Sequence, residues 1–242
     1  MVEPPVAVIT GASRGLGEAL ARALAERGWA LVLDARGADA LSAVEASLPQ
    51  AVAVRAIPGD ITDAGHRAAL VAAARDLGPV TALVNNASLL GPSPLPALAD
   101  HPLDAFAQVM TTNVTAPLAL TQLLLADLRA HHGCVVNITS DAAVEAYQGW
   151  GGYGASKAAL EQLTNVLAAE EGDVRVYRVD PGDMRTQMHQ EAFPGEDISD
   201  RPLPDAAVPG LLALIAGQLP SGRYRAQTMT ADAATDRTGG AA

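Results

Sequence analysis

The chain has little cysteine, few aromatic residues and no long hydrophobic run. Its one cysteine among 242 residues, Cys134, cannot form a disulfide within the chain, so a reducing compartment is the simplest expectation. Aromatic residues make up 3% and charged residues 18% of the chain, against 49% hydrophobic residues, which excludes disordered and fibrous proteins. Because no run of about 18 apolar residues and no signal-peptide pattern is present, we expect a soluble, cytoplasmic protein without a membrane span.

Positive charge is also scarce. The chain has 16 basic and 27 acidic residues, which gives a net charge of −11 at pH 7. General binders of nucleic acid or of anionic membranes need a positive field, so we expect neither as a partner. The basic residues include a single lysine, Lys157, and all the others are arginine.

Short apolar runs alternate with longer amphipathic patterns along the chain. The expected strands are Val6–Thr10, Ala30–Leu33, Ala51–Ile57, Thr81–Val84, Val135–Thr139, Val174–Val179 and a short one near Tyr224–Met229. The expected helices are Leu16–Arg27, Ala38–Leu48, Asp63–Leu77, Leu103 to about Ala130, Tyr153–Glu171 and about Asp205–Gln218. This alternation predicts an α/β fold: a doubly wound, Rossmann-like parallel sheet flanked by helices, in a single domain over residues 1–230.

Two segments depart from the alternation. Residues 183–209 carry Pro194, Pro202, Pro204 and Pro209 with several acids, and we expect a loop that contributes to the substrate site. Residues 231–242 are rich in alanine, aspartate, threonine and glycine, and we expect a flexible tail.

A glycine-rich turn joins the first expected strand to the first expected helix. It reads Thr10-Gly11-Ala12-Ser13-Arg14-Gly15-Leu16-Gly17. Glycines allow a tight turn and a close approach of the backbone to a phosphate, and the helix N-terminus offers unpaired N–H groups to that anion. The turn therefore predicts a dinucleotide-binding site.

Tyr153 and Lys157 lie four residues apart at the start of an expected helix, so they share one face of it. A free tyrosine has a pKa of about 10, and an ammonium group within about 4–6 Å lowers it by roughly 1–3 units. A phenol with a pKa nearer to neutrality can act as acid and as base toward a carbonyl or alcohol. An ordinary surface pair is the alternative, but the only lysine of the chain stands at this position.

Two further polar residues accompany this pair. Ser140 ends the fifth expected strand, where its hydroxyl can bind a substrate oxygen, with Thr139 as a rival. Asn113 lies four residues before Pro117, which lacks an N–H group and so leaves the Asn113 carbonyl unpaired within the helix; a plain proline kink is the alternative. Ser140 lacks a nucleophile-elbow sequence, which argues against a hydrolase. The histidines have no metal-ligand spacing, so no metal is expected.

These motifs together resemble the short-chain dehydrogenase/reductase family. The resemblance rests on the glycine turn, on Asn85-Asn86-Ala87, on Asn113 and Ser140, and on Tyr153-Gly154-Ala155-Ser156-Lys157. It implies that Tyr153 is the general acid/base, that Lys157 tunes Tyr153 and binds the nicotinamide ribose, and that Ser140 holds the substrate oxygen. It also implies a relay water on the Asn113 carbonyl, and a homodimer or homotetramer.

The resemblance also implies a set of cofactor contacts. They are Gly11, Ser13, Arg14, Gly15, Leu16, Gly17, Ala35, Arg36, Asp60, Ile61, Asn86, Ala87, Tyr153, Lys157, Pro181, Gly182 and Thr186. Ser88 departs from the family pattern, which commonly has glycine there, and Asp180 and Asp183 have no assigned role.

The choice between NADP(H) and NAD(H) depends on the end of the second expected strand. Asp34 stands at about the distance where an acid would bind the ribose of NAD(H). Aligned on the family pattern, however, Ala35 takes that place and Arg36 follows, as in members that prefer NADP(H). With Arg14 as a second guanidinium, this favours NADP(H), and NAD(H) remains the alternative.

The sequence thus predicts an oxidoreductase that moves hydride between NADP(H) and a small carbonyl or secondary alcohol substrate, of the ketone or aldehyde reductase type. An NAD(H)-dependent alcohol dehydrogenase and a non-catalytic dinucleotide-binding regulator are the alternatives. The candidate substrate-lining residues, each of which could equally serve in packing, are Tyr147, Trp150, Met184, Met188, His189 and Phe193.

Overall fold

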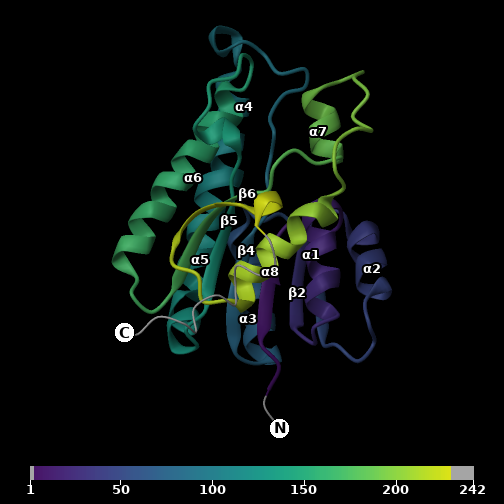
Figure 1. The fold of residues 1–242 in the computed structure, drawn as a ribbon, viewed down its shortest axis with the longest axis vertical. Coiled ribbons are helices and arrows are strands. Elements are labelled where there is room, and N and C mark those ends of the chain that lie inside the picture. Colours follow the sequence, from purple (N-terminus) through teal and green to yellow (C-terminus); the bar gives the residue numbers. More distant parts are fainter. Residues whose placement is uncertain (1–2, 230–242) are drawn as a thin grey trace, which may run out of the picture.

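The computed structural model describes residues 3–229 and contains a seven-stranded parallel sheet (Figure 1). The strands are β1 (Val6–Ile9), β2 (Ala30–Ala35), β3 (Val54–Pro58), β4 (Val80–Asn85), β5 (Cys134–Ile138), β6 (Arg175–Asp180) and β7 (Gly222–Arg225). Their order is β3-β2-β1-β4-β5-β6-β7, so the direction of winding reverses between β1 and β4. Ligands of doubly wound sheets bind at the carboxyl ends of the strands beside such a reversal. The predicted fold class is confirmed.

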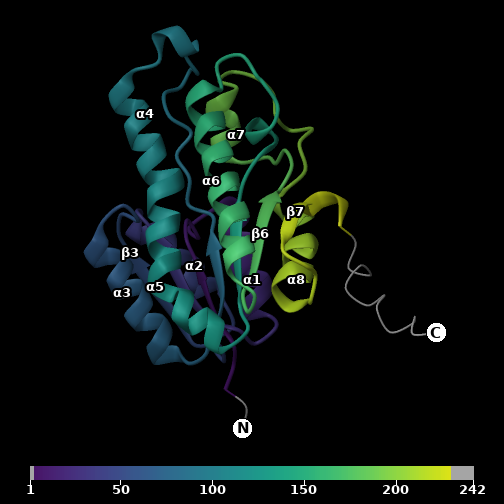
Figure 2. The same ribbon diagram turned by 90° about the vertical axis from the view of Figure 1, so that its left-hand side faces the viewer.

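Helices cover both faces of the sheet (Figure 2). One face carries α1 (Gly15–Ala25), α2 (Ala38–Ser47) and α8 (Val208–Ala216). The other face carries α3 (Ala64–Leu77), α5 (Ala116–Ala130) and α6 (Gly151–Glu170). Two more helices, α4 (Leu103–Met110) and α7 (Gln187–Ala192), lie beyond the carboxyl ends of the strands, in the upper part of Figure 1.

The alternation of side chains along a strand explains why the central strand β1 is apolar throughout. Ile9 of β1 packs in one core cluster with Leu20 of α1, whereas its neighbour Val8 packs in the other cluster with Leu120 of α5. At β1 both faces of the sheet are therefore dry, and each position of this strand needs an apolar residue.

The expected long helix from Leu103 to Ala130 contains a change of hydrogen-bond register. Thr111–Thr115 form a π-helical turn, in which the Ala116 N–H donates to the Thr111 carbonyl. By length and a mean hydropathy of 1.3 this continuous helix would suffice to cross a membrane. Leu120, however, is fully buried against the sheet, which is the position of a core helix in an α/β domain.

The segment 183–209 is not the continuous loop that was predicted, because it contains α7. The hydroxyl of Thr186 accepts the N–H of His189 and so begins this helix. The last predicted strand is shorter than expected, since β7 ends at Arg225 and a 3₁₀ turn follows over Ala226–Thr228. The predicted tail at 231–242 lies outside the described residues.

A buried polar network connects β4 and β5 to helices α5 and α6. The amide nitrogen of Asn85 donates to Asn137 Oδ1 at 2.7 Å and to the Thr121 hydroxyl at 3.3 Å. The amide nitrogen of Asn137 donates in turn to the Thr164 hydroxyl at 2.8 Å. Because all four residues are buried, each one satisfies a group that has no access to water.

Removal of the central amide should therefore be costly. We expect Asn137→Ala to lower the free energy of unfolding by about 1–3 kcal/mol, because Asn85 loses its buried acceptor. Urea denaturation measures the change. The matched control is Asn165→Ala, which removes an exposed asparagine of α6 that bonds only its neighbour Gln162. Equal effects of the two substitutions would show that the network contributes nothing specific.

Candidate active site

The glycine-rich turn is held in shape by the residues that follow β4. Gly11 and Gly15 have φ angles of +65° and +59°, which favour glycine. A Cβ at Gly17 would overlap the Gly11 carbonyl oxygen and the Asn86 amide. The Asn86 amide nitrogen donates to the carbonyls of Thr10 and Gly11, at 2.8 and 3.0 Å. The turn therefore needs glycine at these positions, and Asn86 fixes its path.

This turn fits the phosphates of a dinucleotide. α1 begins at Gly15, and the residue before it, Arg14, has no side-chain acceptor with which to cap the first N–H groups. Those amides are thus available to an anion at the positive end of the helix dipole. The side chain of Leu16 is buried in the core, so of this residue only the backbone can contact a cofactor.

The carboxylate of Asp34 is hydrogen-bonded to His66 and to the backbone of Gly11. Its Oδ1 lies 2.6 Å from His66 Nε2, and its Oδ2 accepts the Gly11 N–H at 3.4 Å. Burial raises the pKa of Asp34, and the hydrogen bond with His66 counteracts the rise. Sequence reasoning missed His66, for which the chain offers no local signal because it comes from α3.

Arg36, two residues after Asp34, remains accessible. Arg36 is exposed directly after β2. The pKa of Asp60 is lowered mainly by hydrogen bonds from Thr62, and the positive charge of Arg36 adds to the lowering. Arg36 and Asp60 thus lie together at the ends of β2 and β3. Arg14, in contrast, donates to the side chain of Gln187 in α7. The predicted contacts Ala35 and Ile61 are both buried, at 7% exposure each.

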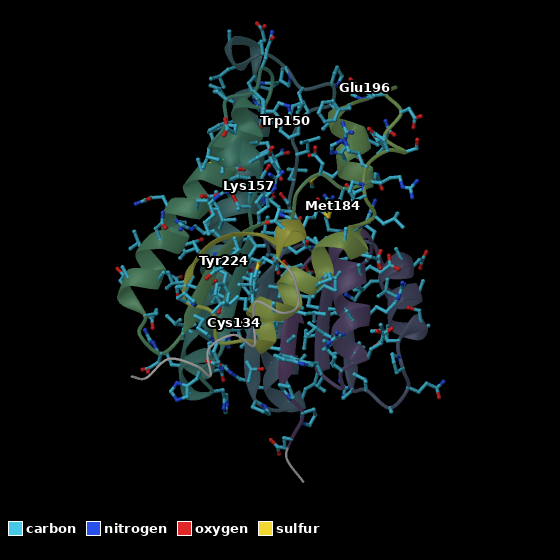
Figure 3. The ribbon with its side chains drawn as sticks, in the orientation of Figure 1. Cys134, Trp150, Lys157, Met184, Glu196 and Tyr224 are labelled. Carbon is cyan, nitrogen blue, oxygen red and sulfur yellow. The ribbon has the colours of Figure 1, made fainter. Side chains whose placement is uncertain are left out.

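A cleft of about 550 Å³ opens at the carboxyl ends of β5 and β6. Tyr153 and Ser140 both line it, with Trp150, Met184, Met188 and His189 of the expected substrate wall. Tyr147 and Phe193 lie behind this wall: the Tyr147 hydroxyl donates to Asp141, and the Phe193 ring packs 5.9 Å from that of Trp150. In Figure 3, Trp150, Lys157 and Met184 lie above the level of Cys134, which begins β5.

Lys157 lies directly behind Tyr153. Its side chain is fully buried, and Nζ donates to the Ile138 carbonyl at 2.8 Å. The distance from Nζ to the centre of the Tyr153 ring is 5.4 Å. Burial lowers the pKa of Lys157 to about 7, because the ammonium form loses its hydration.

The expected lowering of the Tyr153 pKa by Lys157 is wrong for the protein without a cofactor. Burial raises the pKa of Tyr153 well above its usual value, and the charges of Asp141 and Asp180 add to the rise. A hydrogen bond with Ser88 opposes it. Ser88 belongs to the segment Ser88-Leu89-Leu90, which the sequence also suggested as part of the substrate wall.

Asn113 lies in the π-helical turn and anchors the loop after β4. Its Oδ1 accepts the Leu89 N–H at 2.7 Å and the Ser88 hydroxyl at 3.2 Å. Its amide nitrogen donates to the Ser156 hydroxyl at 2.9 Å, which donates to the Tyr153 carbonyl. Pro117 offers no N–H to the Asn113 carbonyl, and π-helical turns inside α-helices are frequent at functional sites.

Ser140 and Thr139 have different partners. The Thr139 hydroxyl is buried and donates to Glu161 at 2.9 Å. The Ser140 hydroxyl faces the cleft, where it donates to Asp141 at 2.9 Å and accepts the Ala142 N–H at 3.1 Å. The geometry therefore favours Ser140 over Thr139 as the group that meets a substrate.

The segment after β6 joins the cleft to the glycine turn. Pro181, Gly182 and Thr186 line the cleft, and the Thr186 methyl group lies 3.5 Å from the position that a Cβ would take at Gly15. Asp180, left without a role above, is buried and accepts the Gly182 N–H at 2.9 Å. The phosphate turn, the Tyr153 hydroxyl and the cleft thus form one continuous site.

Comparisons with known proteins agree with this arrangement. The family described as short chain dehydrogenase matches residues 5–197. The chain belongs to this family. Sepiapterin reductase of Xenopus laevis is 36% identical to this short-chain dehydrogenase over 198 residues, which cover 76% of this chain and 75% of the relative. Serine 3-dehydrogenase of Agrobacterium fabrum is 38% identical over 185 residues, or 75% and 72% of the two chains.

A solved structure gives the same result for the fold. Alcohol dehydrogenase from the archaeon Thermococcus sibiricus, complexed with 5-hydroxy-NADP, superimposes with a TM-score of 0.82 and 29% identity. The match covers 92% of this short-chain dehydrogenase and 96% of that chain. The family resemblance, the enzyme class of oxidoreductase and the Rossmann-like fold are therefore confirmed.

The burial of Lys157 has a directly measurable consequence. Because it is the only lysine, ¹³Cε-lysine labelling gives one side-chain resonance from the whole chain. We expect this resonance in the cofactor-free protein to titrate at about pH 7, against about 10.4 for the same residue after denaturation in urea. A folded-state midpoint near 10 would show that the ammonium is well solvated.

Proposed function

We propose that this short-chain dehydrogenase catalyses the NADP(H)-dependent reduction of a small ketone or aldehyde, and the reverse oxidation of the alcohol. The observation that carries the proposal is that Tyr153 and Ser140 line one cleft, with Lys157 buried behind the phenol. The chemistry that the dinucleotide supplies when bound is hydride transfer. The protein must then bind the substrate oxygen and exchange one proton with it.

Tyr153 is the group that exchanges the proton. In reduction its hydroxyl donates a proton to the substrate oxygen as negative charge develops there. The Ser140 hydroxyl donates a hydrogen bond to the same oxygen once it turns from Asp141, and so holds the oxygen in place. The high pKa of Tyr153 keeps the phenol protonated at neutral pH, as an acid must be.

Lys157 stabilises the phenolate that remains. Loss of the Tyr153 proton leaves a negative charge near Nζ, and this charge raises the pKa of Lys157 while the ammonium lowers that of Tyr153. The two groups therefore titrate as a pair during turnover. A water on the Asn113 carbonyl, to which Pro117 offers no N–H, would return a proton to Lys157 from solvent.

The residues at the adenosine end favour NADP(H) over NAD(H). Asp34, the candidate acid for the ribose of NAD(H), is already bonded to His66 and to the Gly11 amide. Arg36 is exposed beside it, where a guanidinium can bind a 2′-phosphate. Gly11, Gly15 and Gly17 would hold the pyrophosphate, and Thr186 would meet the nicotinamide end. The related alcohol dehydrogenase from T. sibiricus was crystallised with an NADP derivative.

The role of Tyr153 can be tested with a panel of ketones and aldehydes in the presence of NADPH. We expect Tyr153→Phe to reduce kcat by about 100-fold or more, because the proton donor is lost while the ring still fills its place. The matched control is Tyr224→Phe, which removes a hydroxyl that bonds the Pro220 carbonyl outside the cleft and should retain activity. Turnover by Tyr153→Phe at the wild-type rate would contradict the proposed mechanism.

Cofactor preference can be tested separately. We expect Arg36→Leu to weaken NADPH binding by about 10-fold or more and to leave NADH binding nearly unchanged, because only NADPH has the 2′-phosphate. Isothermal titration calorimetry measures both affinities without turnover. Arg55→Leu, an exposed arginine of β3, is the control. An unchanged ratio of the two affinities in Arg36→Leu would refute this assignment.

A further inference from the structure

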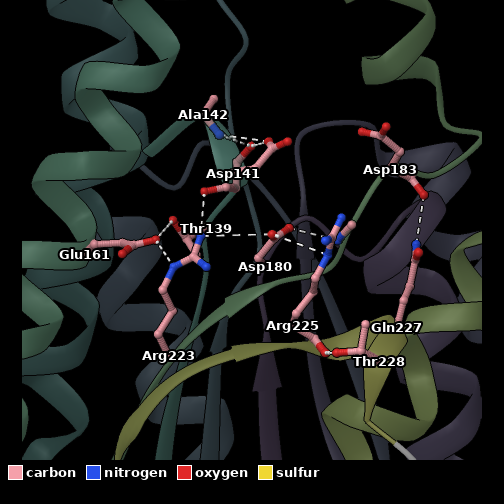
Figure 4. Close-up of polar contacts among 12 residues, drawn as sticks. Thr139, Asp141, Ala142, Glu161, Asp180, Asp183, Arg223, Arg225, Gln227 and Thr228 are labelled. Carbon is pink, nitrogen blue, oxygen red and sulfur yellow. Dashed lines mark hydrogen bonds and ion pairs between the residues drawn. The ribbon is translucent and has the colours of Figure 1, made fainter. Parts of the chain in front are cut away.

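Arg223 of β7 contacts the back of the catalytic site. Its Nε donates to Glu161 Oε1 at 3.0 Å, and one terminal nitrogen donates to the Ser140 carbonyl at 3.2 Å. The same nitrogen lies 4.0 Å from Asp180 Oδ2 (Figure 4). One guanidinium thus joins α6 to the residues that follow β5 and end β6.

The pairing of the last two strands sets this position. β7 runs parallel to β6, with Arg223 opposite Arg178 and Arg225 opposite Asp180. Tyr224 points to the other face of the sheet, where its ring packs 5.8 Å from that of Tyr177. Arg223 and Arg225 therefore share the face on which α6 lies.

Glu161 is a second buried ionisable residue on the same face of α6 as Lys157. The two residues are four apart on α6 and both are buried. They also contact consecutive residues of the sheet, because Lys157 donates to the Ile138 carbonyl and Glu161 accepts the Thr139 hydroxyl. Without a counter-charge, the carboxylate of Glu161 would favour the ammonium form of Lys157.

We propose that Arg223 is a positioning residue of the catalytic site, which neutralises Glu161 beside Lys157 and holds the carbonyl of Ser140. The proposal rests on the proposed function, since it assigns Arg223 a part in setting the protonation of the Tyr153–Lys157 pair. It makes the last strand of the sheet a component of the active site.

Several other charged groups lie around the Tyr153–Lys157 pair, and none of them takes the place of Arg223. They are Asp141 after β5, Asp180 at the end of β6, Arg225 on β7, and Asp183 and His189 in the segment that leads into α7. Arg225 Nε lies 3.9 Å from Asp180, and its side chain is 59% exposed. It therefore offsets Asp180, whereas Arg223 is the arginine that reaches Glu161.

The single lysine makes the electrostatic part of the proposal measurable without any turnover. With ¹³Cε-lysine labelling of the cofactor-free protein, we expect Arg223→Met to raise the pKa of Lys157 by about one unit, since Glu161 loses its counter-charge. Glu161→Gln keeps the Thr139 contact and should lower that pKa. The double variant should return it to the wild-type value, and Arg27→Met, which removes an exposed arginine after α1, should not change it.

The positioning part of the proposal is measured by kinetics. In the double variant the charge balance is restored, but the Ser140 carbonyl still lacks its donor. We expect its kcat for carbonyl reduction to stay about fivefold below the wild-type value, the effect of one hydrogen bond, with an unchanged KM for NADPH. A full recovery of kcat would overturn the positioning role.

The outcomes separate this proposal from the proposed function. A Lys157 pKa that is the same in wild type, Arg223→Met and Glu161→Gln overturns the electrostatic role, even if Tyr153 proves essential for turnover. Expected shifts in a protein that reduces no carbonyl would support the charge coupling and refute the reductase assignment. Should Arg223→Met fail to fold, Glu161→Gln alone still tests the charge coupling.

Discussion

The burial of one ammonium group constrains the whole catalytic site. Lys157 has no exposed position available, because its helix packs against β5 and β6 and its side chain ends below Tyr153. An ammonium in such a place is stable only if nearby groups accept its hydrogen bonds or if it gives up its proton. Within residues 3–229, the acceptor of the Lys157 ammonium group is the Ile138 carbonyl, at the point where β5 ends. The position of the strand end thus decides where the Lys157 ammonium group lies.

Around this lysine, residues from distant parts of the sequence converge because parallel strands end at one edge of the sheet. Ser140 follows β5, Asp180 ends β6, and Asn86 follows β4. The helices supply the remaining groups, and Asn113 connects the loop after β4 to α6 through Ser156. The Asn113–Ser156 bond is buried and the Asn113–Leu89 bond is partly buried, and both hold the loop after β4 in place.

Much of the fold could be predicted from the sequence, because the signals were local. Continuous apolar strands, helical periodicity and the glycine turn each depend on neighbouring residues, and the observed elements follow them within a few positions. The candidate catalytic residues were likewise predicted from short motifs, and the structure brings Tyr153, Lys157, Ser140 and Asn113 into one region. Their catalytic roles remain predictions.

The features that could not be predicted all depend on contacts between distant segments. His66 bonds the carboxylate of Asp34 although the two are 32 residues apart in the sequence, and Arg223 bonds Glu161 although they are 62 residues apart. The predicted direction of the Tyr153 pKa shift was wrong, because spacing along a helix reveals a nearby charge but not the extent of burial. The π-helical turn was missed because Pro117 signals a free carbonyl without specifying how the helix compensates. Helix α7 was missed because it is only six residues long.

The contacts of Asn86 with the glycine turn have a consequence for how the protein folds. The turn follows β1 directly, yet the amide that fixes its carbonyls comes from 76 positions further along the chain. The glycine-rich turn therefore lacks these hydrogen bonds while the chain emerges from the ribosome, when only the first strand and helix exist. It is completed when β4 docks beside β1, a long-range event of the kind that slows folding. A newly made chain would gain its affinity for a nucleotide only after two of the central strands have met.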